Sequence, residues 1–118
     1  MTIQNALASI AVKDLKKASL WYEKLLGKPA DSQPMPEVAE WHFERGGWLQ
    51  VYQNQERAGA GSVTLSVNNA DNQIATLKQL GISTDNQIDN DIVKLVMIKD
   101  PDGNSIAFAQ AKKSDMAQ

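Results

Sequence analysis

The sequence contains no cysteine and only one histidine, His42. The absence of cysteine excludes disulfide bonds, thiol catalysis and thiolate metal sites. With a single histidine, a metal site rich in imidazole would need residues from a second chain. No apolar run approaches the roughly 18–20 residues that cross a bilayer, and the N-terminus lacks the basic and apolar blocks of a signal peptide. We therefore expect a cytoplasmic protein.

An excess of one charge is also absent. The 118 residues include 12 Lys and Arg against 14 Asp and Glu, so the formal net charge is only −2. Because nucleic acids and anionic membranes attract strongly basic proteins, we expect neither as a partner. The length is sufficient for a core, and we expect residues 1–118 to form a single domain.

The N-terminal part of the chain predicts a strand followed by a helix. The segment 6–12 is almost entirely apolar, which is typical of a strand. Asp14 is suited to cap a helix, and Gly27 is suited to end it. Between them, a helical stripe of apolar residues predicts the side that packs on a sheet, at Leu15, Ala18, Tyr22 and Leu25.

Two adjacent glycines predict a hairpin after this helix. The segment 28–37 contains three prolines and leaves room only for a short edge strand. Strand-like runs at 41–45 and 48–52 then flank Gly46 and Gly47. Such a pair is typical of a two-residue hairpin loop, so we expect the two runs to pair through one.

The second half of the chain has the same order of elements. Strict alternation at 62–67 predicts a strand with one polar face. Asn69 or Asp71 is able to cap a second helix, which Gly81 ends. The stripe of this helix is expected at Ile74, Leu77 and Leu80, and a weak strand at 82–88 follows.

The C-terminal part predicts a second hairpin. Its turn is Asp100–Asn104, with the sequence Asp-Pro-Asp-Gly-Asn. Proline presets a turn dihedral, glycine supplies a positive φ, and Asp and Asn bond nearby backbone groups. The β-branched run 92–98 precedes the turn and the alternating run 105–108 follows it. The polar tail 111–118 is expected to be flexible.

These elements indicate an internal repeat. Val12 and Val67 lie 55 positions apart, and Gly47 and Gly103 lie 56 apart. A nearly constant offset is typical of two copies of one unit, each too short to bury much of a core by itself. We place module one at about 1–54 and module two at about 61–110 of the sequence.

Three segments of the chain resemble the vicinal oxygen chelate superfamily, which groups glyoxalases, bleomycin-resistance proteins and extradiol dioxygenases. They are Ile10–Leu15, Trp21–Gly27 and above all Asp100–Asn104, and the resemblance spans roughly residues 3 to 110. It implies an α+β fold in which two βαβββ modules form a curved, open barrel of mixed sheet, with helices on the convex side and a ligand cavity on the concave side. It also implies a bacterial protein and a homodimer, in some relatives with exchanged modules.

The same resemblance raises the question of a metal, because enzymes of this superfamily usually hold one divalent ion. Carried over by position, its oxygen and imidazole ligands fall here on Leu7, Gln50, Ser62 and Ala107. Leu7 and Ala107 have no donor atom, and Gln50 and Ser62 offer only weak neutral oxygens. We therefore expect no metal, no other cofactor and no catalytic residue, which argues against an enzyme without excluding one.

The predicted hairpin loop assigns side chains to faces. With a two-residue loop, Arg45 opposes Trp48 and Phe43 opposes Gln50, and opposed residues share a face. The cavity side then carries Gln50 and four aromatic residues. Together with residues placed by alternation, this gives ten expected ligand contacts: Trp41, Phe43, Trp48, Gln50, Tyr52, Leu7, Ser9, Ser62, Thr64 and Ala107.

The same register places other side chains away from the cavity. His42, Glu40 and Glu44 are expected on the opposite face, solvated and without a catalytic role. A shift of the register by one residue would reverse the whole assignment.

Three functions stay open. The favoured one is a metal-free small-molecule-binding protein of the glyoxalase/bleomycin-resistance type, which holds a flat, partly apolar ligand in an aromatic-walled cavity. The second is a metal-dependent lyase, isomerase or dioxygenase of the same superfamily, or a metal-free enzyme that uses Gln50 or Tyr52. The third is an oligomeric interaction module whose hairpin aromatics are buried at an interface. The sequence does not identify the ligand.

Overall fold

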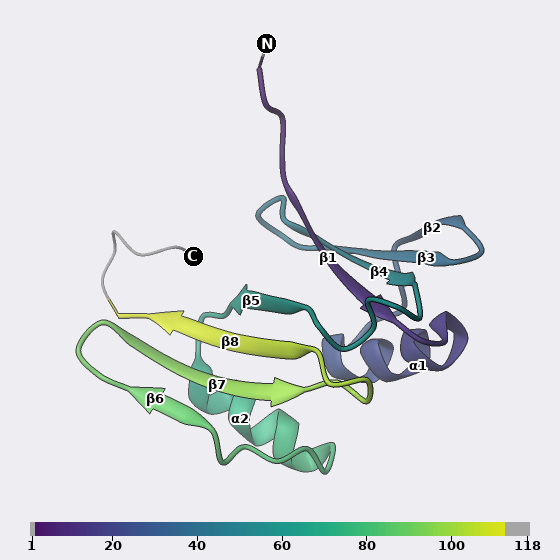
Figure 1. Cartoon of the computed structure of the whole chain (residues 1–118). Coiled ribbons are helices and arrows are strands. Elements are labelled where there is room, and N and C mark those ends of the chain that lie inside the picture. Colours follow the sequence, from purple (N-terminus) through teal and green to yellow (C-terminus); the bar gives the residue numbers. More distant parts are fainter. Residues whose placement is uncertain (1, 113–118) are drawn as a thin grey trace. The chain divides into compact units, whose positions relative to one another are not determined.

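The computed structural model describes residues 2–112, which divide into two compact units (Figure 1). The first unit holds residues 2–61 with 101–104, and the second holds 62–100 with 105–112. Each unit contains a strand, a helix and three further strands in that order, and its strands form one mixed sheet. The predicted α+β fold with two βαβββ modules is therefore confirmed. In this part of the chain, neither helix is long and apolar enough to cross a bilayer.

The first unit consists of a four-stranded sheet with one helix against it (Figure 1). The strand order is β1-β4-β3-β2, with β1 parallel to β4 and the other neighbours antiparallel. Its elements are β1 (Leu7–Val12), α1 (Leu15–Leu26), β2 (Ser32–Met35), β3 (Val38–His42) and β4 (Trp48–Gln53).

The helix α1 begins and ends where local chemistry predicts. The Asp14 side chain accepts a hydrogen bond from the Lys17 N–H at 3.2 Å, and Gly27 has a φ of 78°, the left-handed region that favours glycine. The buried residues of α1 are those of the predicted stripe, Leu15, Ala18, Tyr22 and Leu25. This stripe packs on β3 and β4.

The loop between β3 and β4 differs from the prediction. It has five residues rather than two, and the Phe43 N–H donates to the Gly47 carbonyl oxygen at 2.8 Å. His42, rather than Arg45, therefore opposes Trp48. This is a shift of three residues, and because side chains alternate, an odd shift moves every side chain of β3 to the other face. The predicted register was wrong.

The second unit has the same construction. The strand order is β5-β8-β7-β6, with β5 parallel to β8, and α2 packs on β7 and β8. Its elements are β5 (Ser62–Ser66), α2 (Ala70–Gln79), β6 (Gln87–Asp89), β7 (Val93–Lys99) and β8 (Ser105–Ala111). Of the weak strand expected at 82–88, only Gln87 and Ile88 lie in β6, which extends to Asp89.

The structure decides which residue caps α2. The Asn69 side chain accepts a hydrogen bond from the Asn72 N–H at 2.9 Å, so Asn69 rather than Asp71 is the cap. Leu80, expected in the apolar stripe, is 40% exposed and lies at the end of the helix. At the chain's end, β8 runs to Ala111, the first residue of the expected tail 111–118, and residues 113–118 lie outside the described residues.

The turn that joins β7 to β8 is anchored by a fully buried asparagine, Asn104. Its Nδ2 donates to the Ala11 carbonyl oxygen at 2.8 Å, and its Oδ1 accepts from the Gly61 N–H at 2.8 Å. In the same turn, an Asp102 carboxylate oxygen accepts from the Lys13 N–H at 3.1 Å. These bonds hold the turn against β1 and the connector, and all of these groups belong to the first unit.

The connector needs glycine where it meets this turn. A Cβ added at Gly59 would lie 2.2 Å from the Asp102 carbonyl oxygen, and the Gly59 φ of 86° is in the left-handed region. Any larger residue at position 59 would therefore clash with the backbone of the turn, and its own backbone would be strained at this positive φ.

Replacing Asn104 with alanine is expected to lower the free energy of unfolding by about 1–3 kcal/mol. The substitution leaves the Gly61 N–H and the Ala11 carbonyl without this partner, and unsatisfied buried groups cost that amount. Chemical denaturation followed by circular dichroism measures the difference. Exposed Asn68 supplies the control, since Asn68→Ala should change stability by less than about 0.5 kcal/mol. An unchanged Asn104→Ala midpoint would show that the turn is no anchor.

Candidate functional site

The first sheet has two faces of different character. One packs on α1, and the other is called the Gln50 face here. Directly opposed residues share a face, so the pairing of the strands defines its members. They are Leu7, Ser9 and Ala11 in β1, Trp48, Gln50 and Tyr52 in β4, Val38, Glu40 and His42 in β3, and Ser32 and Met35 in β2.

A row of polar side chains crosses the Gln50 face from β1 to β2. The Ser9 hydroxyl donates to Gln50 Oε1 at 3.2 Å, and Gln50 Nε2 donates to Glu40 Oε2 at 3.1 Å. From the other side, the Ser32 hydroxyl donates to Glu40 Oε1 at 2.9 Å. We call these four residues the polar row. Its hydrogen bonds hold the Gln50 amide and the Glu40 carboxylate in fixed orientations.

Aromatic side chains lie on both sides of the polar row. Trp48 and Tyr52 are two positions before and after Gln50 on β4, and both are partly exposed. The Trp48 ring stacks on the His42 ring, with centroids 3.7 Å apart and planes 16° from parallel. The face thus offers flat apolar surface next to fixed hydrogen-bonding groups.

Hydrogen bonds to its backbone N–H and carbonyl oxygen hold His42 at the edge of this face. Its N–H donates to Asp31 Oδ2 at 2.7 Å, and Lys28 Nζ donates both to the His42 carbonyl oxygen and to Asp31. The His42 N–H and the Lys28 ammonium hold the pKa of the Asp31 carboxyl below its usual value. The His42 Nε2 atom is buried and has no hydrogen-bond partner among residues 2–112.

Two of the predicted aromatic contacts lie elsewhere. Trp41 opposes Leu49 rather than sharing a face with Gln50, and it is fully buried on the helix side. Its indole N–H donates to the Lys28 carbonyl oxygen at 2.9 Å, and its ring lies 6.0 Å from the Tyr22 ring of α1. Phe43 is in the loop rather than in a strand, and it is partly exposed.

The predicted contacts in β1 are on the Gln50 face. Leu7 opposes Trp48 and Ser9 opposes Gln50. Leu7 is 46% exposed, and Ser9 is exposed as well. The residue directly beside Gln50 is therefore Ser9, while Leu7, the carried-over ligand position, lies two residues earlier in β1, opposite Trp48.

The predicted contacts in the second unit share one face of its sheet. Ser62 opposes Ser105, and Thr64 opposes Ala107, as the predicted alternation requires. Ser62 and Thr64 are exposed, whereas Ala107 is buried. At the edge of this face, Lys99 Nζ donates to the Ser105 hydroxyl at 3.1 Å.

Glu40 is the site residue that the sequence interpretation missed. It was expected to be exposed on the other face, but it is 8% exposed and belongs to the polar row. The error follows from the register, because Glu40 and His42 moved to the Gln50 face together. A signal was present in the sequence, since Glu40 interrupts the apolar run Val38–Trp41. The exposed position of Glu44, in the loop, was correct.

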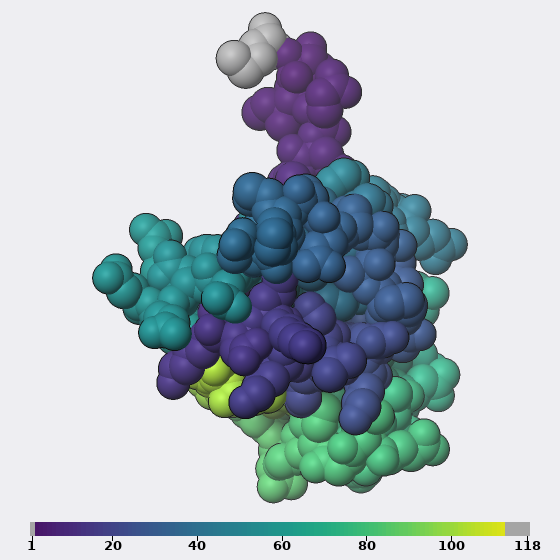
Figure 2. All heavy atoms as spheres, turned by 90° about the vertical axis from the view of Figure 1, so that its right-hand side faces the viewer, coloured from purple at the N-terminus to yellow at the C-terminus, as the bar shows by residue number. Residues whose placement is uncertain are grey.

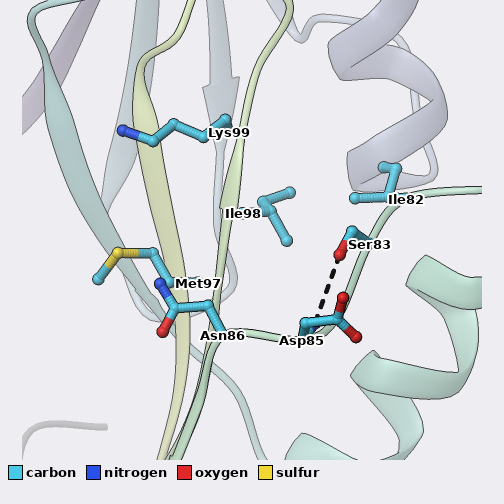
Figure 3. Close-up of a pocket in the computed structure, with 7 residues that line it drawn as sticks. All are labelled: Ile82, Ser83, Asp85, Asn86, Met97, Ile98 and Lys99. Carbon is cyan, nitrogen blue, oxygen red and sulfur yellow. Dashed lines mark hydrogen bonds between the residues drawn. The ribbon is translucent and has the colours of Figure 1, made fainter.

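A separate pocket of about 310 Å³ lies in the second unit. Its walls are the segment after α2 and the end of β7, and Figure 3 shows Ile98 directed toward Ile82 and Ser83, with Met97 and Lys99 directed to the opposite side of the strand. None of the ten predicted ligand contacts lines this pocket. The Ser83 hydroxyl accepts a hydrogen bond from the Asp85 N–H within it.

The residues at the carried-over metal positions do not fit a catalytic divalent ion. Leu7 and Ala107 have no donor atom, and the Gln50 amide is hydrogen-bonded to Ser9 and Glu40. Within the part of the chain that the structure describes, no three His, Asp or Glu side chains gather as a metal site requires. Catalytic metals are typically held by three or more protein ligands, and these positions do not supply them.

Comparison with known proteins identifies a family and solved structures that match this chain. A family model described as the Glyoxalase/Bleomycin resistance protein/Dioxygenase superfamily matches residues 4–108. The solved structure of a glyoxalase / bleomycin resistance protein from Catenulispora acidiphila DSM 44928 is 32% identical, with 92% of this chain and 99% of that chain covered and a TM-score of 0.82. A comparison with curated proteins found no match.

Two more distant structures show the same fold. TnmS3, an antibiotic binding protein from Streptomyces sp. CB03234, is 22% identical, with 93% and 97% of the two chains covered and a TM-score of 0.79. A lactoylglutathione lyase from Agrobacterium tumefaciens is 18% identical, with 96% and 97% covered and a TM-score of 0.78. At these identities the likeness concerns the fold alone.

The family match agrees with the features from which the resemblance was drawn. It spans nearly the whole chain, including the first helix that ends at Gly27 and the turn Asp100–Asn104. The repeated βαβββ order of the two units accords with it. The chain therefore belongs to the glyoxalase/bleomycin resistance protein/dioxygenase superfamily.

Proposed function

We propose that this protein binds a small, flat, partly apolar molecule on the Gln50 face, and that it does so without a resident metal. The observation that carries the proposal is the arrangement on β4, where Trp48 and Tyr52 flank Gln50 and all three are partly exposed. Aromatic rings offer stacking area, and the Gln50 amide and Ser9 hydroxyl are positioned to orient a polar group of the ligand.

The family supports this proposal in general terms. TnmS3, which has the same fold, is described as an antibiotic binding protein, so small-molecule binding is one use of this architecture. In the proposed mechanism the ligand is held by shape, stacking and hydrogen bonds, with no bond made or broken. Ser62, Thr64 and Ala107 belong to the second unit, and they stay predicted contacts that rest on strand alternation and on the resemblance.

The metal-free part of the proposal rests on donor chemistry. A divalent ion taken out of water needs charged or imidazole ligands in compensation, and Leu7 and Ala107 offer no donor at all. The alternative of a metal-dependent lyase, isomerase or dioxygenase would require ligands outside these positions. The alternative of an interface built from hairpin aromatics is weakened. Trp41, one of these aromatics, is fully buried within the first unit and is therefore not available to a partner.

Replacing Trp48 with alanine is expected to weaken ligand binding roughly tenfold or more, the equivalent of about 1.4 kcal/mol, because stacking area is lost. The probes are indole, naphthalene and acridine compounds, each with an ammonium, a hydroxyl or a carboxylate group on a short alkyl arm. Thermal shift identifies the probes that bind, and calorimetry measures their dissociation constants.

The matched control for this experiment is Trp21→Ala. Trp21 is in α1 of the same unit, where its ring meets Tyr22 edge-on, and it is not part of the Gln50 face. Its loss should leave probe affinity unchanged. Equal affinity of the wild type and the folded Trp48→Ala variant would refute the assignment of the site to this face.

Metal analysis of the purified protein is expected to find well below one equivalent of zinc, nickel, manganese or iron. Probe affinity should be the same with and without EDTA, since no ligand contact passes through a metal. Stoichiometric metal, or binding abolished by EDTA and restored by one of these ions, would favour the metal-dependent alternative.

We also propose that the protein is a homodimer, as the resemblance implies. Residues 2–4 project from the rest of the first unit (Figure 2), whereas Asn5 Nδ2 donates to the Gly46 carbonyl oxygen, and Ile3 in the projecting segment is 83% exposed. Burial of such a side chain against a second copy would remove apolar surface from water.

Light scattering is expected to give twice the 12.9 kDa mass of one chain. Ile3→Asp should shift the protein toward the monomer, because a charge would be buried at the contact. Thr2→Asp adds the same charge to an exposed neighbour and should leave the mass unchanged. A monomeric wild type would contradict the proposal.

A further inference from the structure

Glu40 is a buried carboxylate on the face proposed to bind the ligand. It opposes Gln50 on one side and Ser32 on the other, which places it within the Gln50 face rather than at its rim. Only 8% of the residue is exposed. Acidic side chains are rarely buried to this extent unless an opposite charge or a metal compensates them.

The groups that hold Glu40 are all neutral. Oε1 accepts from the Ser32 hydroxyl at 2.9 Å, and Oε2 accepts from the Gln50 amide at 3.1 Å. Among residues 2–112, no Lys, Arg or His forms an ion pair with Glu40 within 4.0 Å. The hydrogen bonds fix the carboxylate in place, but they do not neutralise it.

The carboxylate retains capacity for another donor. An ionised carboxylate has about four acceptor positions, and the bonds from Ser32 and Gln50 occupy two. A further donor that carries positive charge would form a charge-assisted hydrogen bond, which is shorter and stronger than a neutral one. The low dielectric of a partly buried site strengthens the attraction further.

The aromatic neighbours favour the same kind of ligand. Trp48 and Tyr52 are diagonal neighbours of Glu40 across the β3–β4 pair, at the spacing of roughly 7–8 Å that long and aromatic side chains bridge. Aromatic rings attract cations through their π faces, with Trp the strongest. An ammonium bonded to Glu40 would therefore also lie near aromatic surface, while the apolar part of the molecule stacks.

We propose that the ligand of the Gln50 face carries a protonated amine, which forms an ion pair with the Glu40 carboxylate beside Trp48 and Tyr52. This inference rests on the proposed function, since it names the chemical class of the ligand for the same face. Ser9 and Ser32 act as positioning residues at the two ends of the polar row. No bond is made or broken in the step, which is an association of opposite charges.

The test compares matched probes on the wild-type protein. Tryptamine, tryptophol and indole-3-propionate share one ring system and differ in charge, and the naphthalene and acridine compounds form equivalent series. Calorimetry at low salt is expected to rank the ammonium member at least tenfold tighter than the hydroxyl member, with the carboxylate member weakest. The preference should shrink as salt is added, because ion pairs that retain solvent contact are screened.

Glu40→Gln is the decisive variant. The amide keeps the shape of the side chain, and its oxygen can still accept from the Gln50 amide while its nitrogen donates to the Ser32 hydroxyl oxygen, so the ammonium preference should be lost while the hydroxyl probe retains its affinity. Glu44→Gln removes the same charge from the exposed loop next to β3, and it should keep the full preference. Circular dichroism checks that both variants are folded. The ranking of the probes on the wild-type protein tests the proposal even if a variant does not fold.

The outcomes separate this inference from the proposed function. Equal affinity of ammonium and hydroxyl probes for the wild type would refute the charged ligand and leave small-molecule binding intact. A preference that survives in folded Glu40→Gln would also refute it, because another group would then receive the amine. Failure of every probe to bind would overturn the proposed function and this inference with it.

Discussion

The two hydrogen bonds of the buried Asn104 side chain are the constraint on which the first unit depends. Among residues 2–112, β1 pairs with a strand on one side only, β4, and Asn104 bonds the Ala11 carbonyl of this edge strand. The same side chain bonds the Gly61 N–H, at the end of the connector that leads out of the unit. One polar side chain thus ties an edge strand, a connector and a turn together, and each tie satisfies a backbone group.

This constraint has consequences for the Gln50 face. β1 supplies Ser9, whose hydroxyl begins the polar row, and parallel pairing with β4 keeps Ser9 opposite Gln50. The other face of the sheet packs on α1, so the two faces meet different requirements. Burial of Trp41 contributes to the core, whereas the polar row holds a carboxylate in place with neutral donors. A sheet divided in this way can combine a stable core with a chemically specific surface.

Membership of the superfamily does not by itself decide the chemistry. The fold that the chain shares with a lactoylglutathione lyase and with an antibiotic binding protein supports different uses, and the side chains on the sheet faces select among them. Here Leu7 and Ala107 stand where the resemblance expects metal ligands. On the Gln50 face, Trp48 and Tyr52 offer flat apolar surface next to the oriented hydrogen-bonding groups of the polar row.

Local signals in the sequence determined a large part of this structure. The Asp14 cap, the glycine at the end of α1 and the buried stripe of that helix follow from side-chain chemistry within a few residues. The turn Asp100–Asn104 and the offset of 55 between Val12 and Val67 indicated the repeated units and the family. Such features are predictable because each depends on nearby residues or on a simple periodicity.

The register of β3 against β4 was decided only by the tertiary structure, and with it the composition of the candidate site. Two glycines are compatible with a short loop and with the longer one that forms, so the local sequence does not choose between them. The choice depends on which side chains α1 covers. The observed register buries Trp41 beneath the helix, against Tyr22, and keeps the Glu40 carboxylate away from it. Burial of the aromatic ring is favourable, and on the Gln50 face the Glu40 carboxylate finds hydrogen-bond donors in Ser32 and Gln50, so the packing of α1 on the sheet assigned Glu40 to that face.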